Sequence, residues 1–138
     1  MSAVSGIPTR YLYDSTDSLL RFALRADAIV SGLCGLAIAF FADPLSSLTG
    51  LAPVVEYSLG VFLVLYGLFV QSLAALPDLR NAGMGVVGAN TAFTVGALGG
   101  AVALPLTVSG VAASMFSALY TTAFAALQYF GVRRLATA

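Results

Sequence analysis

Long runs of apolar residues occupy most of this chain, and charged positions fall mostly between them. Three runs contain no charged side chain, 57–76, 84–104 and 111–132, and each is bounded by Pro, Gly or a charged residue. A helix needs roughly 20 residues to cross the hydrocarbon core of a bilayer, which is about 30 Å thick. Each of these runs therefore predicts a transmembrane helix.

A fourth apolar run, 22–42, is less uniform because Arg25 and Asp27 lie in its opening turns. Acidic side chains near the start of a helix interact favourably with its dipole, and no residue before Pro44 interrupts the run. We therefore expect one long helix from about residue 15 to residue 42, with its first two turns at the membrane interface.

A cleaved signal peptide is an alternative explanation of this region, because Ala37, Ile38 and Ala39 imitate a cleavage site after an apolar stretch. A signal peptide begins with a short basic leader. The leader here is long and carries Asp14 and Asp17 beside its arginines. These acidic residues favour a retained first span.

The connections between the apolar runs are short, and only 43–56 has a pattern of its own. Asp43 and Pro44 suit the start of a helix, and Gly50 suits its end. The pattern predicts a short interfacial helix between the first two spans. Short connections also make consecutive helices antiparallel neighbours. The expected fold is all-α, a polytopic membrane protein in which four transmembrane helices form an antiparallel bundle, with one domain over 1–138.

The composition supports the membrane class. Hydrophobic residues make up 59% of the chain, charged residues 9%, and the mean hydropathy is +0.97. A soluble domain averages roughly 45–50% apolar and about 25% charged residues, so the excess of apolar surface must face lipid. The expected partner is therefore the lipid bilayer. The net charge is zero, so no basic field exists to hold nucleic acid.

The arginines predict an orientation. Positive residues are retained on the cytoplasmic side of a membrane, whereas acidic residues have little influence. The connections 43–56 and 105–110 contain no arginine or lysine. We therefore expect cytoplasmic N and C termini, with residues 1–14 as a cytoplasmic tail. The arginines lie before or within the first span, between the second and third, and after the fourth: Arg10, Arg21 and Arg25, then Arg80, then Arg133 and Arg134.

Small residues at four-residue intervals predict how the helices pack. Lipid is as apolar as leucine, so helices in a membrane associate where small residues allow close approach. We expect the first, third and fourth spans to touch closely, and the second span, which has few small residues, to be the most exposed to lipid or to meet another protein. A Gly96→Leu change should then weaken the fold more than any change on the second span. The stripes are Asp27, Ser31, Gly35 and Ala39, then Gly88, Ala92, Gly96 and Gly100, then Gly110, Ser114, Ala118, Thr122 and Ala126.

Each span also carries one polar side chain at a similar depth, about 6–9 Å below the cytoplasmic boundary at 1.5 Å per residue. These are Asp27, Gln71, Asn90 and Gln128. A polar group in hydrocarbon is costly unless it is paired, so these four should meet, with Arg21 or Arg25 available to Asp27.

Two interpretations of this polar layer stay open. The layer is either a hydrogen-bonded belt that fixes helix register, or a small pocket around Asp27 that binds a headgroup, a solute or a proton. Tyr66 and Tyr120 fall near the middle of their spans, where their hydroxyl groups need partners. Candidate partners are Thr91, Thr94 and Thr122.

No catalytic pattern is evident. The chain has no histidine and one cysteine, so a metal site or a catalytic triad has no basis. It also lacks paired carboxylates on one helix and a glycine-rich phosphate loop with its lysine. We therefore expect a protein that is not an enzyme and that has no metal and no cofactor.

Two stretches carry a family resemblance. One is 24–53, where Arg25, Ala26 and Asp27 lead into a helix and Asp43, Pro44 and Leu45 follow it; the other is 125–134, with Gln128, Tyr129, Phe130 and Gly131 before the arginine pair. Both resemble small four-helix integral membrane proteins of bacteria, and more weakly the DoxX-like proteins. The resemblance implies the topology and a place in the bacterial inner membrane, and no functional residue, because most members lack an assigned activity.

The sequence is compatible with two hypotheses of function. The first is association, as a homo-oligomer or as an accessory subunit of a membrane complex, because the chain is small and has no soluble domain. The alternative is a small transporter or a lipid- or small-molecule-binding protein that uses the polar layer around Asp27.

Overall fold

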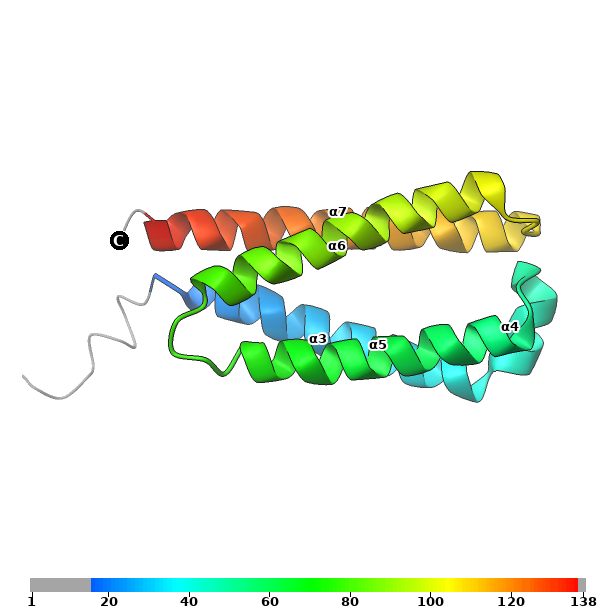
Figure 1. The fold of residues 1–138 in the computed structure, drawn as a ribbon, viewed down its shortest axis with the longest axis horizontal. Coiled ribbons are helices and arrows are strands. Elements are labelled where there is room, and N and C mark those ends of the chain that lie inside the picture. Colours follow the sequence, from blue (N-terminus) through cyan, green and yellow to red (C-terminus); the bar gives the residue numbers. More distant parts are fainter. Residues whose placement is uncertain (1–15, 137–138) are drawn as a thin grey trace, which may run out of the picture.

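The computed structural model describes residues 16–136, and within that range every regular element is a helix. Four of the five helices are long and apolar enough to cross a membrane, which confirms the predicted class (Figure 1). The predicted cytoplasmic tail, 1–14, lies outside the described residues. The helices are α3 (Ser18–Phe40), α4 (Ala42–Thr49), α5 (Pro53–Leu73), α6 (Arg80–Ala103) and α7 (Val108–Ala136).

The long helices begin three or four residues before the predicted spans. The first helix begins at Ser18, before the apolar span at 22 and close to the helix start predicted near residue 15, and the third begins at Arg80, before the span predicted from 84. The predicted spans end at charged residues, because charged residues mark the edge of the hydrocarbon core. The helices are longer because their backbone hydrogen bonds continue into the membrane interface. Pro53, for example, occupies the first turn of α5, where a missing N–H costs nothing.

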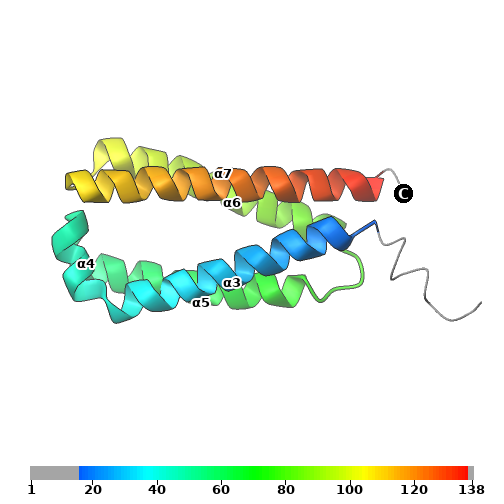
Figure 2. The same cartoon turned by 180° about the vertical axis from the view of Figure 1, so that it is seen from behind.

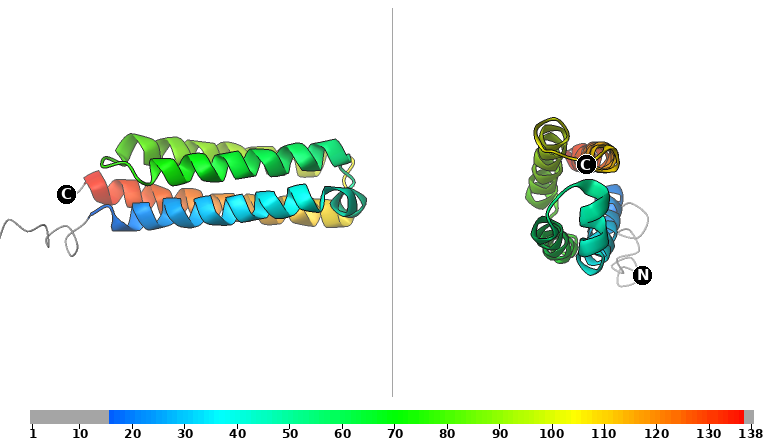
Figure 3. Two further views of the ribbon diagram at one scale, coloured as in Figure 1. Left: turned by 90° about the horizontal axis from the view of Figure 1, so that it is seen from below. Right: turned by 90° about the vertical axis from the view of Figure 1, so that its right-hand side faces the viewer.

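The four long helices lie side by side along one axis and associate as two pairs. α3 packs most extensively on α5, and α6 packs most extensively on α7 (Figures 1 and 2). α3 also contacts α7, whereas its contact with α6 is small. The end-on view separates the two pairs (Figure 3).

Glycines bring α3 and α5 into backbone contact. A Cβ atom added at Gly35 would lie 2.6 Å from the carbonyl oxygen of Gly60, and one added at Gly67 would lie 2.6 Å from that of Ala28. Neither helix could approach so closely with a larger residue there. The expectation that the second span is the most exposed is therefore wrong, because its two interior glycines hold it against the first span.

The stripe on the third span does not pack as predicted. Gly88, Ala92 and Gly96 are exposed, and Gly100 is half-buried. The buried residues of α6 include Val86 and Asn90, and positions two residues further on lie about 200° around the helix at 100° per residue. The stripe thus lies on the face opposite the one that meets the bundle.

The stripe on α7 is only partly inside. Gly110 and Ala118 are buried and Ser114 is half-buried, whereas Thr122 and Ala126 are exposed. Positions spaced by four residues advance about 40° around the helix at each step. A stripe that begins against the neighbouring helices therefore turns outward after a few steps.

The short helix α4 joins the two pairs at one end of the molecule. It contacts α5 and α7, and it ends at Thr49, followed by the capping residue Gly50, which has a φ of 85°. The backbone N–H of Thr107, in the connection between α6 and α7, donates to the Thr49 carbonyl at 3.0 Å. The Thr49 hydroxyl in turn donates to the buried carboxylate of Glu56 at 2.5 Å. A short helix after the first span was predicted; the ties to Thr107 and Glu56 were not.

The hydrophobic core lies toward the opposite end. One of its leucines, Leu20, is fully buried. A Cβ atom added at Gly131 would lie 2.8 Å from the Leu20 Cα, and one at Gly83 would lie 2.8 Å from the Leu20 Cδ2. Two glycines of α6 and α7 therefore make room for one leucine of α3. The cluster consists of Leu20, Leu24, Ala28, Val70, Ala74, Leu79, Val86 and Val132.

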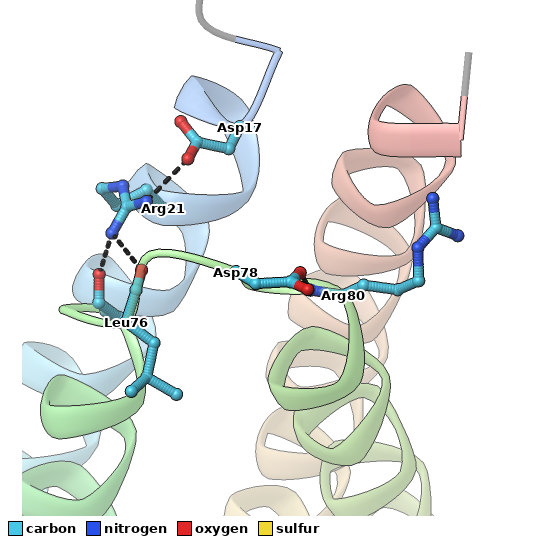
Figure 4. Close-up of polar contacts among 6 residues, drawn as sticks. Asp17, Arg21, Leu76, Asp78 and Arg80 are labelled. Atoms are coloured by element: carbon cyan, nitrogen blue, oxygen red, sulfur yellow. Dashed lines mark hydrogen bonds and ion pairs between the residues drawn. The ribbon is translucent and has the colours of Figure 1, made fainter. Parts of the chain in front are cut away.

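The side chain of Arg21 ties α3 to the end of α5 (Figure 4). Its guanidinium donates to the carbonyls of Ala74 at 2.5 Å and Leu76 at 3.1 Å, and to the Asp17 carboxylate at 2.6 Å. The last carbonyls of a helix have no partner within the helix. Arg21 therefore caps the C-terminal end of α5 and also forms an ion pair with Asp17, the residue before α3.

We expect Arg21→Gln to lower the free energy of unfolding by about 1.5 kcal/mol, the lower end for a hydrogen bond to a charged group. The measurement is the unfolding midpoint in mixed micelles. Arg25→Gln is the matched control, because Arg25 is exposed one turn away on the same helix and should change stability by less than about 0.5 kcal/mol. Equal losses from the two changes would contradict the capping role.

Candidate functional site

The carboxylate of Asp27 lies at the centre of the bundle. It is 0% exposed and is carried on the face of α3 that packs inward. Ser31, one turn further along α3, donates its hydroxyl to the Asp27 Oδ1 at 3.0 Å. The spacing of four residues places both side chains on one face of the helix.

Three other helices direct hydrogen-bond donors at the same carboxylate. Amide groups approach Oδ2 from α6 and α7, and phenol hydroxyls approach from α5 and α7. All four of these donors are neutral. The distances are 2.8 Å from Asn90 Nδ2, 2.9 Å from Gln128 Nε2 and 3.1 Å from the Tyr66 hydroxyl to Oδ2, and 3.1 Å from the Tyr120 hydroxyl to Oδ1.

The amides also bond to each other. Asn90 Nδ2 donates to the Gln128 Oε1 at 2.9 Å, so the three residues Asp27, Asn90 and Gln128 form a closed network. Among the described residues, no buried side-chain nitrogen or oxygen lacks a partner. The structure thus brings together three of the four residues of the predicted polar layer.

Within residues 16–136, no arginine reaches this carboxylate. Arg21 is bonded to Asp17 and to the end of α5, and Arg25 is exposed. Arg25 precedes Asp27 by two residues, which places the two side chains about 200° apart around the helix axis. The Arg25 side chain therefore points to the outside of the bundle. The expected pairing of Asp27 with an arginine is wrong; neutral donors from all four long helices replace it.

Gln71 is the member of the predicted layer that lies elsewhere. It is exposed, in the last turn of α5, which ends at Leu73 rather than at 76. It follows Tyr66 by five residues, so it lies about 140° around the helix from the phenol that does reach Asp27. The predicted inward direction of the Gln71 side chain is therefore wrong.

The sequence predicted that the two mid-span tyrosine hydroxyls need partners, but it predicted the wrong partners and left both tyrosines out of the polar layer. Tyr66 and Tyr120 bond to Asp27 and not to the threonines. The Thr94 hydroxyl instead forms a hydrogen bond with the Thr121 hydroxyl at 2.5 Å, and this bond joins α6 to α7. Thr94 also donates to the Asn90 carbonyl of its own helix at 3.0 Å. One signal was available: Tyr120 and Gln128 are eight residues apart, so they lie within about 80° on one face of α7.

The site can hold a negative charge or a proton. It contains one carboxylate, and every other side chain in it is neutral. Within 16–136 no group of three histidine, cysteine or acidic residues gathers at any point. Tyr66 and Tyr120 are half-buried, so the cluster comes closest to the outside of the bundle at these two phenols.

Comparison with protein-family models, with curated proteins and with solved structures found no match. The resemblance to small bacterial four-helix membrane proteins therefore stays a prediction, and the function has to be argued from this chain alone.

Proposed function

We propose that this protein acts by association within a membrane, as a homo-oligomer or as an accessory subunit of a larger membrane complex. The surface proposed for association is the stripe of α6 formed by Gly88, Ala92 and Gly96. The observation that carries the proposal is that this stripe is exposed, with nothing within 4 Å of a Cβ atom added at Gly88 or Gly96.

α6 is the least covered of the four long helices. Its apolar window is 11% buried inside the chain, compared with 33% for that of α3. Gly85 and Gly99 also have open space where a side chain would be. The backbone of α6 is therefore available for close approach along much of its length.

Glycine in a helix costs about 1 kcal/mol relative to alanine unless close packing compensates for it. The glycines of α3 and α5 have that compensation within the chain. The glycines of the α6 stripe face lipid in the single chain, where a larger side chain would fill space equally well. A second helix packed on this stripe would supply the missing contact.

The proposed placement follows the arginines. We propose an antiparallel arrangement of the four spans with both termini cytoplasmic, in the bacterial inner membrane, and with α4 lying at the opposite interface. Five described arginines lie at the end where α3 begins, and Asp43 and Glu56 lie at the end that holds α4. The Asp27 network then lies near the cytoplasmic side and serves as a structural belt.

The test is crosslinking of the full chain in mild detergent and in proteoliposomes. We expect wild-type protein to give a defined oligomer or a copurifying membrane protein, and Gly96→Leu to lose it without loss of helicity. Ala123→Leu is the matched control, because Ala123 is exposed near the middle of α7. A strictly monomeric wild-type protein with no partner, or equal behaviour of both variants, would contradict the proposal.

A second candidate, binding of a proton or small solute, is supported by one observation. The Asp27 carboxylate is bonded to neutral donors and no cation, so a proton or a polar solute could compensate its charge. The Asp27→Asn variant separates the candidates. If Asp27→Asn abolishes proton uptake by proteoliposomes and leaves the oligomers unchanged, the binding function is favoured. If wild-type protein shows no proton uptake, association remains as the proposed function.

A further inference from the structure

The Asp27 carboxylate is a buried group whose charge no side chain of the described residues balances. It is 0% exposed, and each of the five side chains of 16–136 that donate to it is neutral. A charge buried in an apolar medium is costly unless an opposite charge or a metal ion compensates for it. A bound cation would make this site neutral.

Three hydroxyl oxygens lie next to this carboxylate. Ser31 and Tyr120 place theirs 3.0 and 3.1 Å from Oδ1, and Tyr66 places its own 3.1 Å from Oδ2. A hydroxyl group that donates one hydrogen bond keeps lone pairs for another partner. Oxygen atoms of this kind, together with a carboxylate, are the ligands that hard cations prefer.

The two amides supply further oxygen. The Gln128 Oε1 accepts from Asn90 Nδ2 at 2.9 Å, so one amide oxygen already lies inside the network. Both amide nitrogens point at the Asp27 Oδ2. Half a turn of either amide group exchanges its nitrogen for its oxygen at the same place. Each amide can therefore serve either as a donor to the carboxylate or as a ligand of an ion beside it.

Charge and size select the kind of ion. One carboxylate balances one positive charge, whereas calcium sites usually gather several carboxylates. Among the described residues, the other buried carboxylate is Glu56, which bonds to Thr49 at the α4 end of the molecule. Contacts of 2.8 to 3.1 Å close the network from four helices, so a small ion fits it better than a large one.

We propose that the Asp27 network binds one sodium ion, with the carboxylate and the neighbouring hydroxyl and amide oxygens as ligands. This inference rests on the second candidate function, binding at Asp27, and names its ligand. The expectation of no metal was based on histidine and cysteine, which are ligands of zinc and iron and not of sodium. Tyr66 and Tyr120 are half-buried, so the ion would reach the carboxylate past these two phenols.

The test measures binding of radioactive sodium to the purified full chain in detergent, with choline chloride keeping the ionic strength constant. We expect saturable binding of one sodium ion per chain. Choline should not compete, because it is too large for a network closed by direct hydrogen bonds. Potassium should compete less well than sodium, because it is the larger of the two ions.

Asp27→Asn should weaken sodium binding by at least about 100-fold, because it removes the charge that balances the ion. Asp43→Asn is the matched control. It removes an exposed carboxylate from α4, at the other end of the molecule, and should change the binding by less than about twofold.

A second pair of variants decides the matter if Asp27→Asn does not fold. Ser31→Ala removes one ligand oxygen and should weaken sodium binding by about tenfold, which corresponds to one hydrogen bond to a charged group. Ser58→Ala is its control, because Ser58 is exposed and donates its hydroxyl to the Val54 carbonyl of its own helix. The control should bind sodium like wild-type protein.

Three results would overturn the proposal. The first is no saturable sodium binding by wild-type protein, and the second is equal competition by potassium or choline. The third is an equal effect of either variant and its control. These readouts are separate from crosslinking, so their failure leaves the association proposal standing. Proton uptake in sodium-free buffer by a wild-type protein that binds no sodium would leave the second candidate function standing, with a proton as the ligand.

Discussion

Gly67→Leu is expected to destabilise this protein by about 3 kcal/mol, the upper end of the cost of overpacking a filled interior. The new Cβ atom alone would lie 2.6 Å from the carbonyl oxygen of Ala28 and 3.0 Å from the Gly32 Cα. Both atoms belong to the backbone of α3 and cannot turn aside as a side chain can. α3 and α5 would have to separate, and the hydrogen bond from the Tyr66 hydroxyl to Asp27 would lengthen as a result.

The same change at Gly96 is the control. A Cβ atom there meets nothing within 4 Å, so Gly96→Leu should change the stability of the single chain by less than about 0.5 kcal/mol. Unfolding midpoints in mixed micelles, under conditions where the protein is monomeric, provide the measurement. The sequence pattern alone predicts the opposite order. Equal losses, or a larger loss at Gly96, would contradict the observed pairing of α3 with α5.

Asp27→Leu is expected to have the second large effect. It removes the acceptor of five side-chain donors and leaves the amides of Asn90 and Gln128 without their central partner. At about 0.6 kcal/mol for an average hydrogen bond between membrane helices, the five donors together account for about 3 kcal/mol. The free energy of unfolding should fall by about that amount.

Two milder variants test whether the loss comes from the network. Asp27→Asn keeps the shape and one acceptor oxygen, so its loss should lie between wild type and Asp27→Leu. Ser31→Ala removes one donor at the edge of the network and should cost about 0.6 kcal/mol. If Asp27→Leu were as stable as wild type, the cluster would not be a structural belt. If Asp27→Asn were fully stable yet lost a binding activity, the second candidate function would gain.

The predicted depths of polar residues were useful, but their directions were not all correct. Asp27, Asn90 and Gln128 meet as expected from their depth, because alternating helices bring equal depths together. Gln71 was predicted at a similar depth, yet its side chain is exposed. The angle around a helix axis depends on which neighbour the helix packs against, and a single polar residue does not reveal that neighbour.

Hydropathy and segment length determined the class of this protein, because both are local properties of the chain. Four apolar runs, each long enough to cross a bilayer, predicted the four long helices, and Asp43, Pro44 and Gly50 predicted the short one after the first. Only the tertiary structure decided which glycines are in contact. Gly67 and Gly96 look alike in sequence, yet one lies against the backbone of α3 and the other faces outward. The difference arises because close packing depends on the facing helix, and a glycine carries no side chain that could indicate what faces it.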